Sequence, residues 1–312
     1  MSAQHHYISK FHLKQFLDPD SLPLKDSWLW QGFVPDGPVR RRAPKNVATV
    51  PLMFDGPGGL ADPDETLETF LANKVEQPAA AAMREVSSWP HGIGGNMPPA
   101  LFRYLAWAAA RSLPMQALEE SWGKKLFGHH AEPIEPPPEG LLNATQIRRD
   151  VRMLHPSLGR RLFPANSDFE HAASDGWFPD MTDRTNFLES IHIQAYYFQV
   201  RFFPRLKWFV LHPPQGEFFI IADRPVGWVV EGSVEAPPSA LRHPSAYVLA
   251  PVSKTLLLLG RHTSEPWAVT PTQVNAVMAS WAQTWIAGPT EATVRSALEN
   301  RQPAVAPSRL VH

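Results

Sequence analysis

Apolar and polar positions are densely interleaved at the start of the chain. Three histidines and two lysines stand there among Tyr7, Ile8, Phe11, Leu13 and Phe16. The apolar residues lie mostly on one side at helical spacing, so the pattern predicts a short helix that ends at Asp18-Pro19-Asp20. Chain ends are usually frayed and polar. This one instead predicts a segment packed into the body of the protein together with its histidines.

The middle of the chain has the apolar spacing of helices. One helix is expected from Asp64 to Met83, with a kink at Pro78, and a second from Ala100 towards Phe127. An aromatic-rich third helix is expected over residues 185–203.

Strand patterns flank these helices. Short apolar runs predict strands over residues 28–33, 206–212, 217–222, 226–231, 247–252 and 255–259. Two further helices are expected over residues 272–287 and from Thr290 to Glu299. Helices followed by strands predict an α+β fold, with a central helical bundle packed on a mostly antiparallel sheet, rather than alternating βαβ units. One compact body over residues 1–300 and a mobile tail over 301–312 are expected.

Composition narrows the classes of function. The chain has 312 residues, a formal net charge of -1 and no cysteine. Disulfides, thiolate zinc sites and cysteine nucleophiles are therefore excluded. No secretory signal and no membrane-length apolar run is visible, which predicts a soluble cytoplasmic protein.

Familiar catalytic motifs are absent from the sequence. It contains no HExxH, no GxSxG, no Walker loop and no GxGxxG placed between a strand and a helix. His129-His130 stand in a proline-rich loop, residues 40–45 form a basic loop, and the arginines between 148 and 161 predict a solvated helix face.

Four segments, in order, carry a resemblance to a known family. They are His5-His6-Tyr7-Ile8-Ser9-Lys10-Phe11-His12-Leu13-Lys14-Gln15-Phe16, then Leu71-Ala72-Asn73-Lys74-Val75-Glu76, Ala106 to Pro114, and Phe219-Ile220-Ile221-Ala222-Asp223-Arg224-Pro225-Val226. The chain resembles the DUF4238 family of uncharacterised, mainly bacterial proteins. The resemblance implies a shared fold and supplies no established activity.

The two adjacent histidines are the first candidates for a site. Neighbouring residues on a helix diverge by roughly 100°, so only one of His5 and His6 is expected to enter a given pocket. His6 lies four residues before Lys10 and would share its helix face. We assign His6 as a general acid/base or a neutral metal ligand, and His5 and Lys10 as substrate-binding residues. The alternative for any single histidine is a structural role with satisfied hydrogen bonds.

Two charged residues on the predicted helices complete the set. Glu76 stands in an otherwise apolar stretch and could orient the histidine, hold a metal or pair with a cation. Arg111 lies among small residues, and a buried guanidinium there needs a carboxylate or phosphate partner. The alternatives for Arg111 are an anion clamp and a structural ion pair with Glu76 or Asp223.

Asp223 follows the apolar run that ends at Ala222 and precedes Arg224-Pro225. A carboxylate at the end of a buried strand can be catalytic, or it can accept hydrogen bonds from its own turn.

The expected function is a hydrolase that acts on a phosphate-containing substrate, as a nuclease or phosphodiesterase. His6, Glu76 and Asp223 would be catalytic, and His5, Lys10 and Arg111 would bind the substrate, because cations beside a histidine suit phosphoryl chemistry. A divalent metal is compatible with this set, and nucleic acid is one expected partner. The alternative is a non-enzymatic binding or regulatory module in which these residues form a buried network.

Overall fold

One four-stranded antiparallel sheet forms the middle layer of the molecule. Its order is β5 (Lys207–Leu211), β9 (Leu256–Arg261), β8 (Tyr247–Ser253) and β7 (Gly227–Val229). Successive residues alternate between two hydrophobic cores, so Leu256 and Leu258 join one core and Leu257 and Leu259 the other. Burial of both faces explains why this strand reads as a continuous apolar run.

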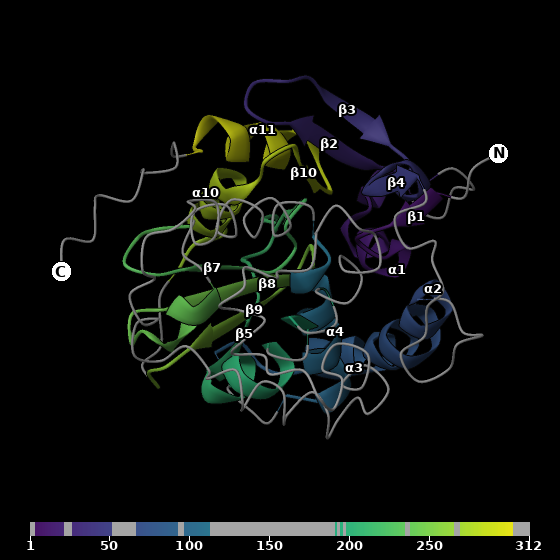
Figure 1. Ribbon diagram of the computed structural model, residues 1–312. Coiled ribbons are helices and arrows are strands. Elements are labelled where there is room, and N and C mark those ends of the chain that lie inside the picture. Colours follow the sequence, from purple (N-terminus) through teal and green to yellow (C-terminus); the bar gives the residue numbers. More distant parts are fainter. Residues whose placement is uncertain are drawn as a thin grey trace, which may run out of the picture.

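The computed structural model of the protein (Figure 1) describes residues 4–21, 27–51, 67–92, 97–112, 191, 194–195, 198–234, 238–264 and 269–301. The predicted histidine loop at 129–130, the arginines between 148 and 161, most of the helix over 185–203 and the tail beyond residue 301 lie outside these ranges.

A second antiparallel sheet joins segments from both ends of the chain. Its order is β3 (Val39–Arg42), β2 (Leu29–Phe33), β10 (Trp285–Gly288) and β6 (Ile221–Ala222). Helix α11 (Glu291–Glu299) packs so closely on it that a Cβ on Gly32 would lie 2.8 Å from Val294. Helix α10 (Pro271–Trp281) covers the second core, and a capping box at Thr270 starts it.

The helical layer covers the other face of the middle sheet. It consists of α2 (Leu67–Phe70), a π-helical segment (Leu71–Glu76), α3 (Gln77–Ser87) and α4 (Pro99–Ala110), followed along the chain by a second π-helical segment (Phe198–Phe202).

Pro78 lies in the first turn of α3, directly after the π-helical segment, where the sequence predicts a kinked α-helix. Proline has no N–H for the carbonyl of Lys74, four residues earlier. Nη1 of Arg103 donates to that carbonyl over 3.3 Å.

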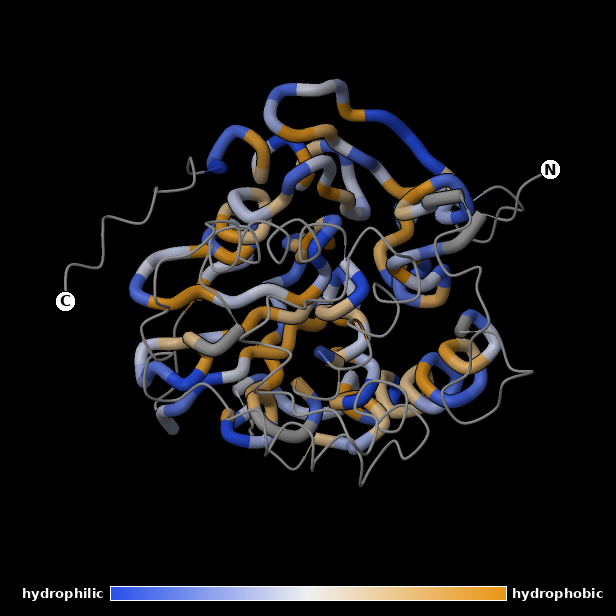
Figure 2. The backbone as a smooth tube through the Cα atoms, viewed as in Figure 1, coloured by the Kyte–Doolittle hydropathy of each residue, from blue (hydrophilic) through white to orange (hydrophobic). Residues whose placement is uncertain are grey.

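The N-terminal segment is not one helix. Strand β1 (Gln4–His6) pairs with β4 (Thr49–Pro51), and only Lys10–Leu13 form the short helix α1, which continues as a 3₁₀ turn (Lys14–Phe16). The segment does dock between helices and sheet as predicted, because His12 contacts Tyr104 of α4 and the carbonyl of Pro251 of β8. Tyr7, Ile8, Leu13 and Phe16 of this segment are buried. Figure 2 shows the hydrophilic run of β3 leading towards the segment.

These observations confirm the α+β class and the antiparallel pairing of the strands. The described helices do not show the predicted central bundle. In the described part of the chain, two four-stranded sheets and a two-stranded one take the place of the predicted single sheet. The basic loop over residues 40–45 is partly strand, since β3 pairs with β2. The helix expected to reach residue 287 ends at Trp281, because the next residues pair with β2 and β6 instead. None of the described helices is long and apolar enough to cross a membrane.

Candidate functional site

His6 ends β1 with its imidazole half-buried. Burial, together with the nearby positive charge of Lys10 and then of Arg111, lowers the pKa of His6 to about 4, although the carbonyls of Pro44 and Lys45 raise it. The ring is therefore neutral at neutral pH. Its Nε2 atom is buried and has no hydrogen-bond partner among the described residues. Nε2 is therefore a hydrogen-bonding atom whose capacity no described residue uses.

Arg111 and Glu76 form an ion pair near this ring. Nη1 of Arg111 lies 2.9 Å from Oε1 of Glu76, and the two side chains are 1% and 22% exposed. Arg111 follows the last residue of α4, and Glu76 is the last residue of the π-helical segment. Such segments change the direction of the side chains beyond them and are frequent at functional sites. We call His6, Lys10, Glu76 and Arg111 the His6 cluster.

A second polar group lies next to it, formed by Ser9, Tyr104 and His12, which we call the Ser9 network. Nε2 of His12 lies 2.7 Å from the carbonyl oxygen of Pro251, so this nitrogen must carry the hydrogen and donate it. Nδ1 of His12 is then an acceptor, and the Tyr104 hydroxyl donates to it over 2.8 Å. Ser9 in turn donates to the Tyr104 oxygen over 2.9 Å.

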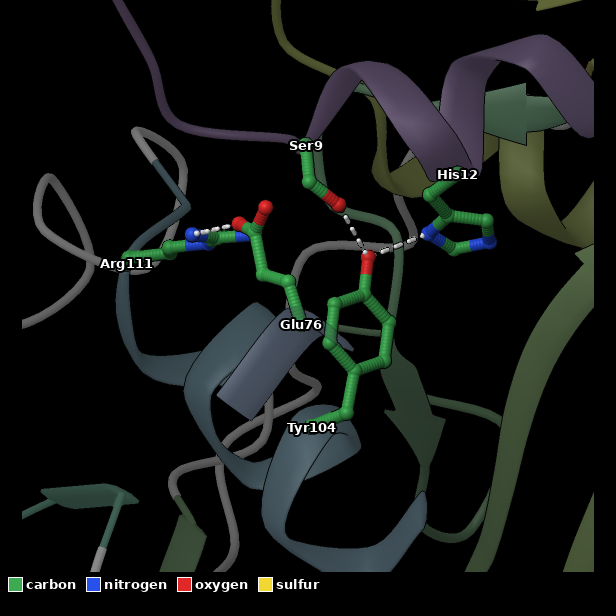
Figure 3. A network of polar contacts seen from close by, with 5 residues as sticks. All are labelled: Ser9, His12, Glu76, Tyr104 and Arg111. Atoms are coloured by element: carbon green, nitrogen blue, oxygen red, sulfur yellow. Dashed lines mark hydrogen bonds and ion pairs between the residues drawn. The ribbon is translucent and has the colours of Figure 1, made fainter. Parts of the chain in front are cut away.

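The Ser9 network is buried, and its hydrogen bonds determine which atom of each pair is the donor. Ser9 is 2% exposed, and Tyr104 and His12 are 0% exposed. Burial lowers the pKa of His12 to about 4, in agreement with a neutral ring. Burial also raises the pKa of Tyr104, while the Arg111 charge lowers it and the Glu76 charge raises it again. Figure 3 shows the resulting arrangement, with the Glu76–Arg111 pair on one side of Tyr104 and His12 on the other.

Asp223 lies apart from both groups, in the turn that carries the chain from β6 to β7. Its Oδ2 accepts hydrogen bonds from the Thr284 amide and hydroxyl, both at 2.6 Å, and from the Gln283 amide at 3.1 Å. Burial raises the pKa of Asp223, and these hydrogen bonds oppose that rise. Asp223 therefore holds the turn between α10 and β10, rather than receiving N–H groups from its own turn.

The structure brings together four of the six residues that the sequence singled out: His6, Lys10, Glu76 and Arg111. No hydrogen bond or ion pair in the described part of the chain links Asp223 to them. His5 lies in β1, and its side chain is not among those described. Lys10 does approach His6 as predicted, but His6 belongs to a strand, so a shared helix face is not the reason.

Sequence reasoning missed the part played by Ser9, His12 and Tyr104. The spacing of Ser9 and His12, one helical turn apart within an apolar segment, is a signal that could have identified the first two. Nothing near Tyr104 in the sequence marks it as their partner. Within the described ranges, no group of three or more acidic or histidine side chains is placed to hold a metal ion.

Comparison with known proteins identifies a family and nothing more specific. The model of the family DUF4238, a protein family of unknown function, matches residues 143–290. This region includes Asp223 and does not reach the N-terminal segment. No curated protein and no solved structure matches the chain. The resemblance predicted from the sequence is thus confirmed: over residues 143–290 the chain matches the family DUF4238.

Proposed function

We propose that the protein hydrolyses a phosphate ester at the His6 cluster, with His6 as the group that transfers the proton. One observation carries the proposal: the buried Nε2 atom of His6 has no partner among the described residues and lies in the field of Lys10 and Arg111. The two cations attract an anion to this place, and the neutral imidazole beside them can accept a proton.

The chemical step needs no protein nucleophile. A water molecule attacks the phosphorus while Nε2 of His6 accepts one of its protons, and the bond from phosphorus to the leaving oxygen breaks. The leaving oxygen takes a proton from solvent, and His6 later returns its own. Arg111 and Lys10 would stabilise negative charge on the phosphoryl oxygens, and Glu76 would hold Arg111 in place. Asp223 has no part in this chemical step and stabilises the turn between α10 and β10.

Ligand binding would also tune His6. The positive charges of Lys10 and Arg111 lower its pKa. A bound phosphate compensates these charges, so its arrival raises the pKa of His6 towards neutrality, where an imidazole is most effective as a proton-transfer group.

The test is turnover of a generic phosphodiester, bis(4-nitrophenyl) phosphate, and of the matching monoester, with EDTA and with added Mg²⁺ or Mn²⁺. We expect His6→Gln to abolish turnover while the protein remains folded, and His243→Gln, at an exposed histidine, to leave it unchanged. The ratio kcat/KM should fall as the pH drops towards 4, where His6 becomes protonated. Equal turnover by His6→Gln and the unaltered protein would refute the proposal.

A second candidate function is a non-enzymatic module that the Ser9 network locks into one conformation. The observation in its favour is that this network is sealed and joins the N-terminal segment to α4 and β8. In that case His6→Gln changes the melting temperature and no turnover is detected in any variant. Circular dichroism melting curves of the variants used in the turnover assay separate the two functions.

A further inference from the structure

A run of positive charge follows the outer strand of the second sheet. Arg40, Arg41 and Arg42 lie on β3, and Lys45 follows in the next turn. None of these four side chains forms an ion pair within the described ranges, although the whole chain carries a formal net charge of only -1. Figure 2 shows most of β3 as a hydrophilic stretch that leads towards β4 and β1.

One of these arginines lies over two aromatic rings. The Arg41 guanidinium carbon lies 4.8 Å from the ring centroid of Trp28 and 5.0 Å from that of Trp30. Both indole nitrogens donate to the same Oδ2 atom of Asp18, over 3.2 Å and 2.7 Å. Asp18 is itself 7% exposed. We call these four residues the Arg41 stack.

The Arg41 stack is more than protection of a sheet edge. Charged residues on an outer strand prevent sheets from pairing edge to edge, and Arg40 and Arg42 would serve that purpose. Edge protection needs charge alone, however, and does not need two indoles fixed by a buried carboxylate. The Arg41 guanidinium lies over the two indoles and belongs to an exposed residue, so it presents a planar, cationic surface to solvent.

The basic strand also leads to the His6 cluster. β3 ends at Arg42 and passes into the turn Pro44–Asn46, whose first two carbonyls lie beside the His6 ring. The same turn packs against α1, which begins with the exposed Lys10. Arg42, Lys45 and Lys10 therefore lie on successive packed segments between the Arg41 stack and the candidate site.

We infer that β3 and the Arg41 stack bind single-stranded nucleic acid, with one base lying on the Arg41 guanidinium. Side chains alternate along a strand, so Arg40 and Arg42 leave the face opposite Arg41, and they would meet the phosphates around the outer edge of the sheet, together with Lys45 in the next turn. Unpaired bases stack on aromatic rings and on arginine planes, and their phosphates supply negative charge to this basic surface. A duplex would keep its bases out of reach. The further claim that the bound nucleic acid continues towards His6 rests on the proposed function. Binding at β3 is independent of that function.

The test is fluorescence anisotropy of the full chain with labelled thymidine and uridine 12-mers, which also distinguishes DNA from RNA. An abasic 12-mer and inorganic polyphosphate carry charge without bases. We expect Arg41→Ala to weaken 12-mer binding about tenfold, which is within the range for removal of one stacked base. For Arg40→Ala, which removes a phosphate contact, the plot of log affinity against log salt should become shallower by about 0.7 for each phosphate lost. Arg41→Lys keeps the charge and should still weaken binding severalfold, because an ammonium offers no plane for a base.

Arg295→Ala is the matched control, because Arg295 is an exposed arginine paired with Glu291 on α11. This variant should bind the 12-mers as tightly as the unaltered protein. Equal affinity for the abasic and the base-containing 12-mers would overturn the inference, and so would normal binding by Arg41→Ala. If Arg41→Ala is unfolded by circular dichroism, Arg41→Lys and Arg40→Ala decide in its place.

Binding and turnover fail separately. Oligonucleotide binding without hydrolysis of any phosphodiester would refute the proposed function alone. Hydrolysis of bis(4-nitrophenyl) phosphate without 12-mer binding would refute only the present inference.

Discussion

The N-terminal segment contributes to two polar groups that differ in how completely their hydrogen-bonding atoms are used. In the Ser9 network each hydrogen bond fixes the position of a proton, from Ser9 through Tyr104 to His12 and on to the carbonyl of Pro251. In the His6 cluster, the Nε2 atom of His6 has no partner among the described residues, and Glu76 is partly exposed.

The difference in hydrogen bonding indicates which of the two groups could bind a ligand. A buried, fully satisfied network stabilises one conformation and loses energy when any member is removed. A buried acceptor without a partner is costly to the folded protein, and a cost of that kind is typical of a site that binds something. The contrast can be tested by removing members of each group, together with the equally satisfied Asp223.

The largest effect is expected from Asp223→Ala. This change leaves the part-buried amides of Gln283 and Thr284 without their shared acceptor, and it empties the buried position of the carboxylate. We expect the free energy of unfolding, measured by urea denaturation, to fall by about 3–5 kcal/mol. Asp20→Ala, at an exposed position, should change it by less than about 0.5 kcal/mol. An Asp223→Ala protein of unaltered stability would make Asp223 a candidate catalytic group again.

The next effect is a dependence of stability on pH. Burial lowers the pKa of His12 from 6.5 to about 4 in the folded protein. Between these values the unfolded chain binds a proton that the folded chain refuses, so stability is complete above pH 6.5 and is lost as the pH falls towards 4. At 1.36 kcal/mol per pH unit this amounts to about 3 kcal/mol. The half-buried His6 adds a smaller loss over the same range.

Urea unfolding at intervals across the window between pH 6.5 and about 4 measures this dependence. His12→Gln should flatten the curve, whereas His243→Gln should not. A curve that stays steep in His12→Gln would show that another group is responsible.

Tyr104→Phe should cost less. It removes the hydroxyl between Ser9 and His12 and leaves both without their partner. We expect the free energy of unfolding to fall by about 1–3 kcal/mol, and Ser9→Ala, which removes only a donor, to cost about 1 kcal/mol. Turnover of the phosphodiester should persist in both variants. Loss of turnover in Tyr104→Phe without loss of stability would make the network part of the site.

The smallest effect on stability is expected from Lys10→Ala, less than about 0.5 kcal/mol, because Lys10 is exposed. The variant should nevertheless raise the pKa of His6, since the Lys10 charge is one of the causes that lower it. Titration of the histidine ring protons by NMR measures this change, with Lys14→Ala as the control. An unchanged His6 titration would separate Lys10 from the cluster.

Local patterns predicted much of the fold. The strands at β2, β5, β8 and β9 and the start of α11 at Thr290 follow from apolar runs and a capping residue, which act over a few neighbouring positions. The end of α10 could not be predicted in this way. Residues Trp285–Gly288 leave the helix because β2 and β6, far away in sequence, offer them hydrogen bonds.

The candidate site divides in the same manner. The sequence identified His6, Lys10, Glu76 and Arg111 as charged or titratable groups inside apolar segments, and it left open whether Arg111 pairs with Glu76 or Asp223. The structure selects Glu76, through the π-helical segment that ends at this residue.

By itself the sequence determined which segments must be buried, which side chains carry charge into them, and the α+β class, because these depend on the nature and spacing of neighbouring residues. Only the tertiary structure decided that the Arg111 charge acts on His6 and that Tyr104 joins Ser9 to His12. It also decided that Asp223 accepts hydrogen bonds from a turn far away in the sequence. These contacts join residues far apart along the chain, and their geometry is fixed only when whole layers pack.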